Sequence, residues 1–255
     1  MKIAHISDIH CTKGQDFNER IFDKAAKLVN AQEPDFVFVS GDLTTEGLIS
    51  DYDIAREKLK SIEGDIAIVP GNHDERNLGY RLFPEYFGKM DFIKDFGDIR
   101  LAGLASSEPD KDDGRLGTGR HQIIRDAISS AKQDGKIAMV GFHHHIIPIP
   151  NSGREKNIVE DAGETLDIIL RSRMPIVLMG HRHVPYAVKV NDTMMISAGT
   201  LSCNRTRAHF GNTFNIIEIE GNLVEVSVMN VRTEKACKML SYCKKPYKYE
   251  NKYCE

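Results

Sequence analysis

The chain has 255 residues, of which 41% are hydrophobic and 28% are charged, and its formal net charge at pH 7 is −3. This length suits one large domain with a sizeable core, while the slight negative charge excludes a global attraction to nucleic acid as the basis of function. No apolar run approaches the roughly 20 residues of a membrane span, and no signal peptide is visible. Because the five cysteines also lack CxxC spacing, we expect a cytoplasmic protein with reduced thiols and no membrane partner.

Along the first 180 residues, short apolar runs alternate with segments in which apolar residues recur at helical spacing. The runs are rich in β-branched residues and predict buried strands at 3–7, 36–40, 66–69, 99–104, 137–142 and 176–179. The helical spacing predicts helices around 21–29, 55–62, 124–131 and 162–170. This alternation favours parallel or mixed sheets covered by helices.

After residue 180 the predicted strands follow one another closely, at 187–190, 194–197, 214–219 and 224–228. The pairs Asn191-Asp192 and Gly221-Asn222 between them are typical of hairpin turns and predict antiparallel pairing. We assign residues 1–231 to one domain. The basic segment 232–255 is interpreted as a C-terminal tail, docked or partly mobile.

Residues that can bind metal ions follow five of the predicted strands, at the point where each strand ends. They are Asp8 and His10, Asp42, Asn72 with His73, His143 to His145, and His181 with His183. Taken singly, each of them is more often a structural hydrogen-bonding group, but chance would not place so many at the edge where α/β sheets gather their sites. Residues two apart on an extended segment point to the same side, so each pair can bind one cluster of ions. The glycines at 41, 71 and 180 allow tight turns beneath it.

In this order the motifs resemble the signatures of calcineurin-like metallophosphoesterases, over roughly residues 2 to 220. The matching segments are Asp8-x-His10, Gly41-Asp42, Gly71-Asn72-His73-Asp74, a His at 143 to 145, and Gly180-His181-x-His183. The resemblance implies an α/β fold, a four-layer α/β/β/α sandwich with two mixed sheets flanked by helices. That architecture agrees with the predicted succession of parallel and antiparallel strands.

The resemblance also implies a centre of two divalent metal ions. In it Asp8, His10 and His183 bind one ion, Asn72, His143 and His181 bind the other, and Asp42 bridges both. His145 competes with His143, because alternation along the chain places both on the same side. His73 is not a ligand in this scheme; it lies near the substrate together with Asn72 and is the expected catalytic residue.

Mixed Asp, Asn and His ligands suit Mn²⁺, Fe, Co²⁺ or Zn²⁺ better than Mg²⁺ or Ca²⁺. Two such ions about 3.5–4 Å apart lower the pKa of a bound water and clamp the attacking and leaving oxygens. We hypothesise that a metal-bound hydroxide attacks phosphorus opposite the leaving alkoxide. A positively charged His73 then stabilises the developing charge or protonates the leaving oxygen.

Arg205 and Arg207 follow the predicted strand that ends at residue 197 and are candidates for binding phosphate, with solvated loop charges as the equal alternative. Their segment resembles the Gly-Thr…Arg-x-Arg…Asn stretch of the cyclic-nucleotide phosphodiesterase-like branch. Cys11 is expected to be a small buried side chain, and His5, His121 and His209 to be structural or surface residues. The segment 106–119 predicts a mobile loop, either a solvated connection or a cover over the site.

We therefore expect a metal-dependent phosphodiesterase that acts on a small phosphate ester such as a cyclic nucleotide. A phosphomonoesterase or an Mre11-like nuclease is the alternative in the same reaction class, and nucleic acid is not the favoured substrate because the net charge is −3. A metal-binding scaffold without catalysis is the alternative in a different class. Substrate, native metals and oligomeric state stay open at this stage.

Overall fold

The computed structural model describes residues 1–154 and 156–243, which form two six-stranded sheets. The first sheet has the strand order β12-β11-β10-β1-β2-β3. Its parallel strands are β1 (Lys2–Ile6), β2 (Phe36–Val39) and β3 (Ile66–Ile68), and its antiparallel strands are β10 (Thr213–Glu220), β11 (Leu223–Asn230) and β12 (Lys235–Cys243). The parallel strands therefore occupy one half of this sheet and the late hairpins the other.

The second sheet has the order β4-β5-β6-β7-β9-β8. Four of its strands are parallel, namely β5 (Ile99–Gly103), β6 (Ile137–Gly141), β7 (Ile176–Met179) and β9 (Thr193–Ser197). Its edges are the antiparallel strands β4 (Phe92–Phe96) and β8 (Tyr186–Val190). The late strands are thus shared between the two sheets. Both predicted hairpins, β8-β9 and β10-β11, pair antiparallel, and β9 lies parallel to β7 on its other side.

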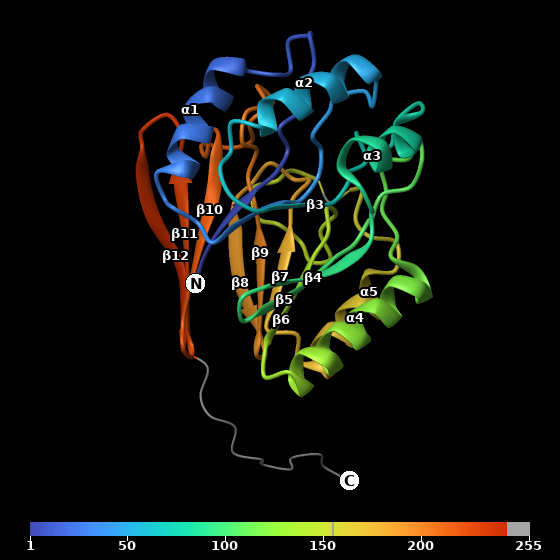
Figure 1. Cartoon of the computed structure of the whole chain (residues 1–255), viewed down its shortest axis with the longest axis vertical. Coiled ribbons are helices and arrows are strands. Elements are labelled where there is room, and N and C mark those ends of the chain that lie inside the picture. The colour runs from blue at the N-terminus through green and yellow to red at the C-terminus, as the bar shows by residue number, and fades with distance from the viewer. Residues whose placement is uncertain (155, 244–255) are drawn as a thin grey trace.

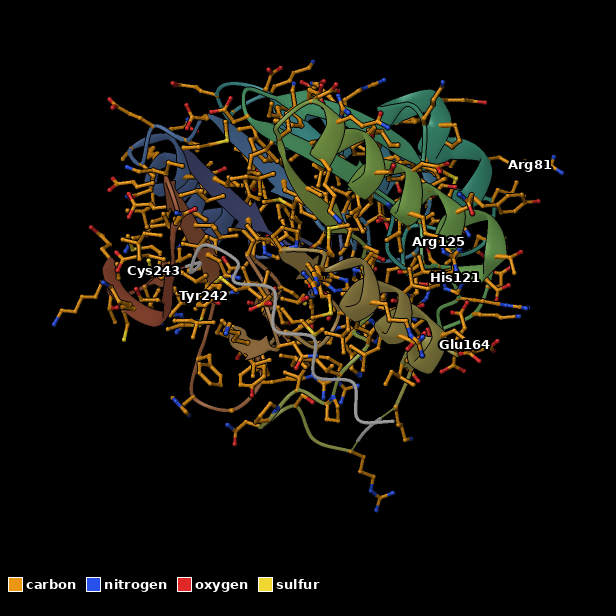
Figure 2. All side chains as sticks on the ribbon, turned by 90° about the horizontal axis from the view of Figure 1, so that it is seen from below. Arg81, His121, Arg125, Glu164, Tyr242 and Cys243 are labelled. Carbon is orange, nitrogen blue, oxygen red and sulfur yellow. The ribbon has the colours of Figure 1, made fainter. Side chains whose placement is uncertain are left out.

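The helices form the outer layers (Figure 1). The first sheet is covered by α1 (Glu19–Asn30), α2 (Ile49–Leu59) and α3 (Gly79–Phe87), and the second by α4 (Gly117–Gln133) and α5 (Ala162–Ser172). Helix α1 begins at Asn18, whose side chain caps it by accepting a hydrogen bond from the Ile21 amide. Figure 2 shows His121 and Arg125 on α4 and Glu164 on α5, on the side of the molecule away from the first sheet.

Alternation along the strands produces three apolar layers. On β1, Ile3 faces the second sheet while Ala4 packs under the helices of the first. On β7, Ile176 belongs to the layer between the sheets and Val177 to the layer under α4 and α5. The predicted α/β fold, with two mixed sheets flanked by helices in four layers, is confirmed.

Three elements were not expected from the sequence. Helix α3 contains Pro84, β4 is an edge strand with exposed polar residues, and β12 is largely exposed at the end of its sheet. All nine residues of β12 lie within the predicted tail, so residues 235–243 extend the first sheet, while 244–255 lie outside the described residues. The domain boundary at residue 231 stays a prediction. Within the described part of the chain, no helix is long and apolar enough to cross a membrane.

Candidate metal centre

Seven side chains meet where β1, β2 and β3 of the first sheet and β6 and β7 of the second end. We call them the Asp42 centre: Asp8, His10, Asp42, Asn72, His143, His181 and His183. All except His181 are buried. These are the seven residues expected as metal ligands, drawn from segments up to 175 positions apart, from Asp8 to His183.

One donor set consists of Asn72, His143 and His181. Asn72 Oδ1 lies 3.2 Å from His143 Nε2 and 3.1 Å from His181 Nδ1, and the two imidazole nitrogens are 3.2 Å apart. Ligand atoms that bind one ion at about 2.0–2.2 Å lie about 3–3.5 Å from each other. The three atoms therefore have the spacing of ligands around a single ion.

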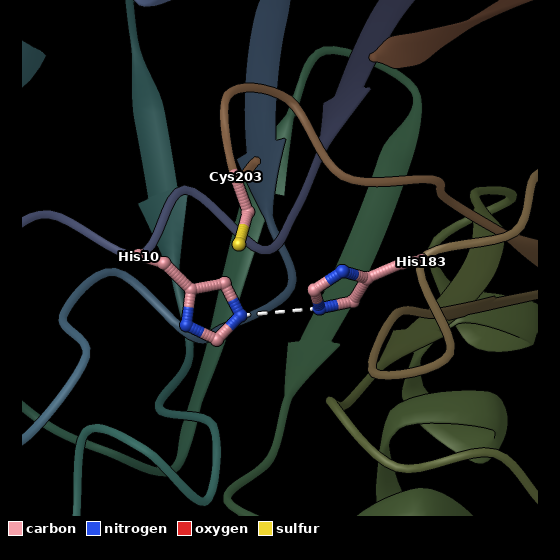
Figure 3. A group of neighbouring side chains, drawn as sticks. All are labelled: His10, His183 and Cys203. Carbon is pink, nitrogen blue, oxygen red and sulfur yellow. Dashed lines mark hydrogen bonds between the residues drawn. The ribbon is translucent and has the colours of Figure 1, made fainter. Parts of the chain in front are cut away.

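The other donor set consists of Asp8, His10 and His183. The Nε2 atoms of His10 and His183 face each other at 3.1 Å, as Figure 3 shows, and Asp8 Oδ1 lies 3.1 Å from His183 Nε2. Asp8 Oδ1 is buried and accepts no hydrogen bond from the described residues. A buried carboxylate oxygen in this position is costly unless a cation binds it, so the set fits a metal ion.

Asp42 links the two sets through one oxygen. Its Oδ2 lies 3.5 Å from His10 Nε2 and 3.3 Å from His143 Nε2, while its Oδ1 accepts a hydrogen bond of 2.9 Å from the His73 amide. Asp8 is fixed in the same way, because its Oδ2 accepts from the His181 amide at 3.0 Å. In both carboxylates one oxygen is held by the backbone and the other points into the centre.

The orientation of two imidazoles is set from outside the centre. The Nδ1 of His143 donates to the Ser40 carbonyl at 2.6 Å, and the Nδ1 of His183 donates to the Arg205 carbonyl at 2.7 Å. Each Nε2 is thereby left on the side of the donor set. This arrangement, in which the second ring nitrogen donates to a carbonyl, is typical of histidines that bind metals.

The charges of the centre favour a cation. Burial lowers the pKa of His10 and of His181 well below the usual value, so both rings are neutral. Burial also opposes protonation of His143, but the Asp42 carboxylate raises the pKa of His143 to about 9. Burial alone would raise the pKa of Asp42, whereas His143 and His73 lower it well below its usual value. The Asp42 centre thus holds carboxylate charge that a proton or a metal ion must balance.

The backbone beneath the centre is strained. Asp8, His10, Asp42, His181 and His183 all have positive φ, between 53° and 72°. They lie in irregular segments and bends, not on extended segments, so the expected reason for their common direction was wrong although their side chains do converge. Gly41, at φ 91°, has no room for a side chain, because a Cβ there would lie 2.7 Å from His143 Nδ1.

The other histidines and cysteines differ in their distance from the centre. His143, and not His145, lies within reach of Asp42 and Asn72; the His145 ring stacks on His181 at 5.7 Å. Cys11 is buried in the core, as expected. Cys203, which the sequence did not suggest, lies beside His10 and His183 and could serve as a further donor (Figure 3). His5 and His121 are buried and hydrogen-bonded, and His209 is exposed.

A pocket of about 370 Å³ opens over the Asp42 centre. His73 lines it, and its Nδ1 donates to the Thr45 carbonyl at 2.6 Å, which leaves Nε2 on the other side of the ring. Arg205 and Arg207 also line the pocket, and Arg207 donates to the Ser152 carbonyl at 2.6 Å. The other lining residues outside the centre are Arg76, Asp112, Asn157, Arg182 and Thr206. Of these, only Asp112 falls in the segment 106–119 that was a candidate cover.

Two kinds of sequence relative were found. A sequence model described as calcineurin-like phosphoesterase matches residues 1–185. A probable cyclic nucleotide phosphodiesterase of Coxiella burnetii is 24% identical over 78% of this chain and 82% of its own length. A glycerophosphodiester phosphodiesterase GpdQ of Enterobacter lignolyticus is 28% identical over 72% of this chain and 71% of its own.

Solved structures show the same fold. A dimetal phosphatase from Danio rerio superimposes with a TM-score of 0.74 at 9% identity, over 94% of this chain and 98% of that one. Purple acid phosphatase PPD1 from yellow lupin has a TM-score of 0.75 at 14% identity, over 96% of this chain. This chain spans about half of the lupin protein, 54% of its length.

Proposed function

The chain belongs to the calcineurin-like phosphoesterase family of metal-dependent hydrolases, and on that premise we propose that it is a phosphodiesterase whose two divalent ions are held by the Asp42 centre. The observation that supports this proposal is the position of Asp42 Oδ2, which lies within 3.5 Å of one imidazole from each donor set. An oxygen shared by two sets of ligands is what a dinuclear site requires.

We assign Asp8, His10 and His183 to one ion and Asn72, His143 and His181 to the other, with Asp42 as the bridge. His143 is preferred to His145 because its Nε2 faces Asp42 and Asn72. The donor set of imidazoles, carboxylates and one amide suits Mn²⁺, Fe, Co²⁺ or Zn²⁺. Two such ions supply Lewis acidity at the phosphate and lower the pKa of a bound water.

The side chains of this chain contribute binding and proton transfer. Arg205 and Arg207 line the pocket and can bind the phosphate oxygens, and Asn72 and His73 lie on the wall where the ester would rest. His73 is oriented by the Thr45 carbonyl, so its Nε2 is placed to donate a proton to the leaving oxygen. The departing alcohol is thereby neutral when it leaves.

The lining of the pocket is polar and suits a polar alcohol. Among the described residues that line it, none is aliphatic and the only aromatic ones are histidines. Histidine rings and arginine guanidinium groups can also stack on a nucleobase. A glycerophosphodiester, the substrate class in the name of one relative, is therefore our second candidate beside the cyclic nucleotide.

The test begins with metal-free protein that is reloaded with Mn²⁺, Fe²⁺, Co²⁺ or Zn²⁺ and assayed for bound metal. We expect two ions per chain in the wild type and fewer in Asp42→Ala, with the exposed Asp113→Ala as the control. The loaded enzyme is then compared on bis(p-nitrophenyl) phosphate, p-nitrophenyl phosphate, cyclic AMP, a glycerophosphodiester and single-stranded DNA. Preference for the monoester or for DNA, or fewer than two ions in the wild type, would refute the proposal.

A further inference from the structure

Asp112 makes contact with the side chain of a proposed ligand from outside the centre. It lies in the loop between β5 and α4, and its Oδ1 accepts a hydrogen bond of 3.2 Å from Asn72 Nδ2. The opposite end of that amide, Asn72 Oδ1, faces His143 Nε2 and His181 Nδ1. The amide group of Asn72 is therefore held between a carboxylate on one side and the second donor set on the other.

An asparagine side chain has two nearly equivalent orientations, and only one of them can bind a metal ion. The oxygen has lone pairs to offer, whereas the NH₂ group donates hydrogen bonds and has none. A carboxylate only accepts hydrogen bonds, so Asp112 selects the orientation in which NH₂ points away from the centre. The neighbouring Asp42 carboxylate cannot make this choice, because it lies on the side of the ions.

Asp112 is itself fixed by two contacts. Arg76 Nη2 donates to the same Oδ1 at 3.0 Å and balances the carboxylate charge. The Asp112 carbonyl accepts from Nε2 of the buried His144 at 3.0 Å, and the Nδ1 of that ring is 2.9 Å from Ser106 Oγ. His144 thus links Ser106 near the start of the loop to Asp112 within it, and Asp112 is held close to Asn72.

We propose that Asp112 is a positioning residue for the second metal ion: by accepting from Asn72 Nδ2 it keeps Asn72 Oδ1 turned toward the ion. The proposal rests on the proposed function in one respect, that Asn72 is a ligand. Partners of this kind, which orient a ligand without touching the metal, typically change metal affinity about 10- to 100-fold when removed.

The test is a titration of metal-free protein with Mn²⁺ by calorimetry, with bound metal counted after dialysis. In Asp112→Ala we expect the dissociation constant of one ion to rise about 10- to 100-fold and that of the other to change less than about threefold. Asp112→Asn retains an oxygen that can accept from Asn72, so its two constants should stay within about threefold of wild type. Asp113→Ala, which removes the adjacent exposed carboxylate, should bind as the wild type does.

Each contrary result has a distinct meaning. If the wild type binds two ions and Asp112→Ala binds both equally tightly, the positioning role is wrong while the proposed function stands. If Asp112→Asn is as damaging as Asp112→Ala, the lost charge matters and the orientation of the amide does not, which also overturns the proposal. If the wild type binds fewer than two ions, the proposed function fails together with this role.

Discussion

Residues next to the proposed ligands in the sequence hold other parts of the protein in place. Ile9, between Asp8 and His10, is fully buried in the apolar layer under the helices of the first sheet. His144 follows His143 and binds the loop that carries Asp112. At the scale of single residues, a short segment such as Asp8–His10 therefore contributes both to the proposed metal site and to packing. The amino-acid sequence alone does not show which residue has which role.

At this scale His73 offers the clearest test of catalysis. If its Nε2 protonates the leaving oxygen, His73→Ala should lower kcat by about 100-fold or more for a diester with an alkyl leaving group. The loss should be below about tenfold for bis(p-nitrophenyl) phosphate, because p-nitrophenolate leaves without a proton. Steady-state kinetics on both substrates measure the difference, with His209→Ala as the exposed control and bound metal counted in each variant. Equal losses on the two substrates would assign His73 an electrostatic role instead.

The buried His5 should make the free energy of unfolding depend on pH. Burial lowers its pKa to about 3, although Asp8 offsets part of this effect, whereas an unfolded histidine has a pKa of about 6.5. As the pH falls from about 6.5 toward 3, the unfolded chain binds a proton that the folded protein does not, so the free energy of unfolding decreases by up to about 1.4 kcal/mol per pH unit. Above pH 6.5 this contribution is fully present and constant.

The measurement is urea unfolding of metal-free protein between pH 7.5 and 4.5. His5→Gln loses the hydrogen bond to Ser40 and is expected to be less stable overall, but its stability should fall less steeply with decreasing pH than that of the wild type. Parallel slopes for the two proteins would show that His5 does not titrate on unfolding.

At the scale of elements, buried residues hold two of the loops that line the pocket in place. One loop, between β5 and α4, is fastened by His144. The other contains Ser152, Arg154 and Lys156, whose carbonyls accept hydrogen bonds of 2.7–3.1 Å from the buried side chain of Arg182. The proposed ligands follow the ends of strands. Two residues next to them in the sequence, His144 and Arg182, hold the loops that line the pocket.

Arg182→Ala should therefore destabilise the loop that contains Ser152, Arg154 and Lys156. We expect a loss of about 2–3 kcal/mol in the free energy of unfolding, because hydrogen bonds from a charged group to buried carbonyls are lost. Amide exchange of residues 150–154 and 156–158 should become faster, and KM should rise because Asn157 and Arg207 line the pocket from this side. Hydrogen–deuterium exchange measures the first effect, and Arg154→Ala, which removes an exposed side chain from the same loop, is the control. Unchanged exchange in Arg182→Ala would contradict the role of this residue.

At the scale of the whole molecule, each proposed ion joins the two sheets. Asp8 and His10 follow β1 of the first sheet and His183 follows β7 of the second; likewise Asn72 follows β3 while His143 follows β6. The sheets are otherwise held by the apolar layer between them, in which Gly141 allows the Phe38 ring to lie directly against the second sheet. Metal binding should therefore stabilise the folded state as well as supply the chemistry.

Removal of metal tests this coupling. An ion at about 100 times its dissociation constant adds about 2.7 kcal/mol, so saturating Mn²⁺ should raise Tm by about 5–10 °C over protein in chelator. Asp42→Ala should show little or no rise, because it removes the bridging carboxylate, whereas Asp113→Ala should show the full rise. Differential scanning calorimetry supplies the values. A wild-type Tm that is independent of Mn²⁺ would show that the ions do not link the sheets.

The sequence by itself determined most of the architecture, because hydrophobic periodicity is a local property of the chain. All ten predicted strands and all four predicted helices are present. In most of the strands, the observed ends differ from the predicted ends by one or two residues. It could not reveal α3, β4 or β12, since a proline lies inside the first and the two edge strands carry mainly exposed residues. There the decisive interaction is the pairing with a neighbour, which no local pattern records.

The residue types of the candidate site were likewise visible in the sequence, as acids, amides and histidines after five strands. Only the tertiary structure decided that His143 faces Asp42 while His145 stacks on His181, and that Arg207 is engaged with Ser152. It also introduced Asp112, whose distance from Asn72 along the chain hides their contact. The physical reason is that side-chain direction at residues of positive φ, and the docking of one sheet on another, depend on contacts between distant segments.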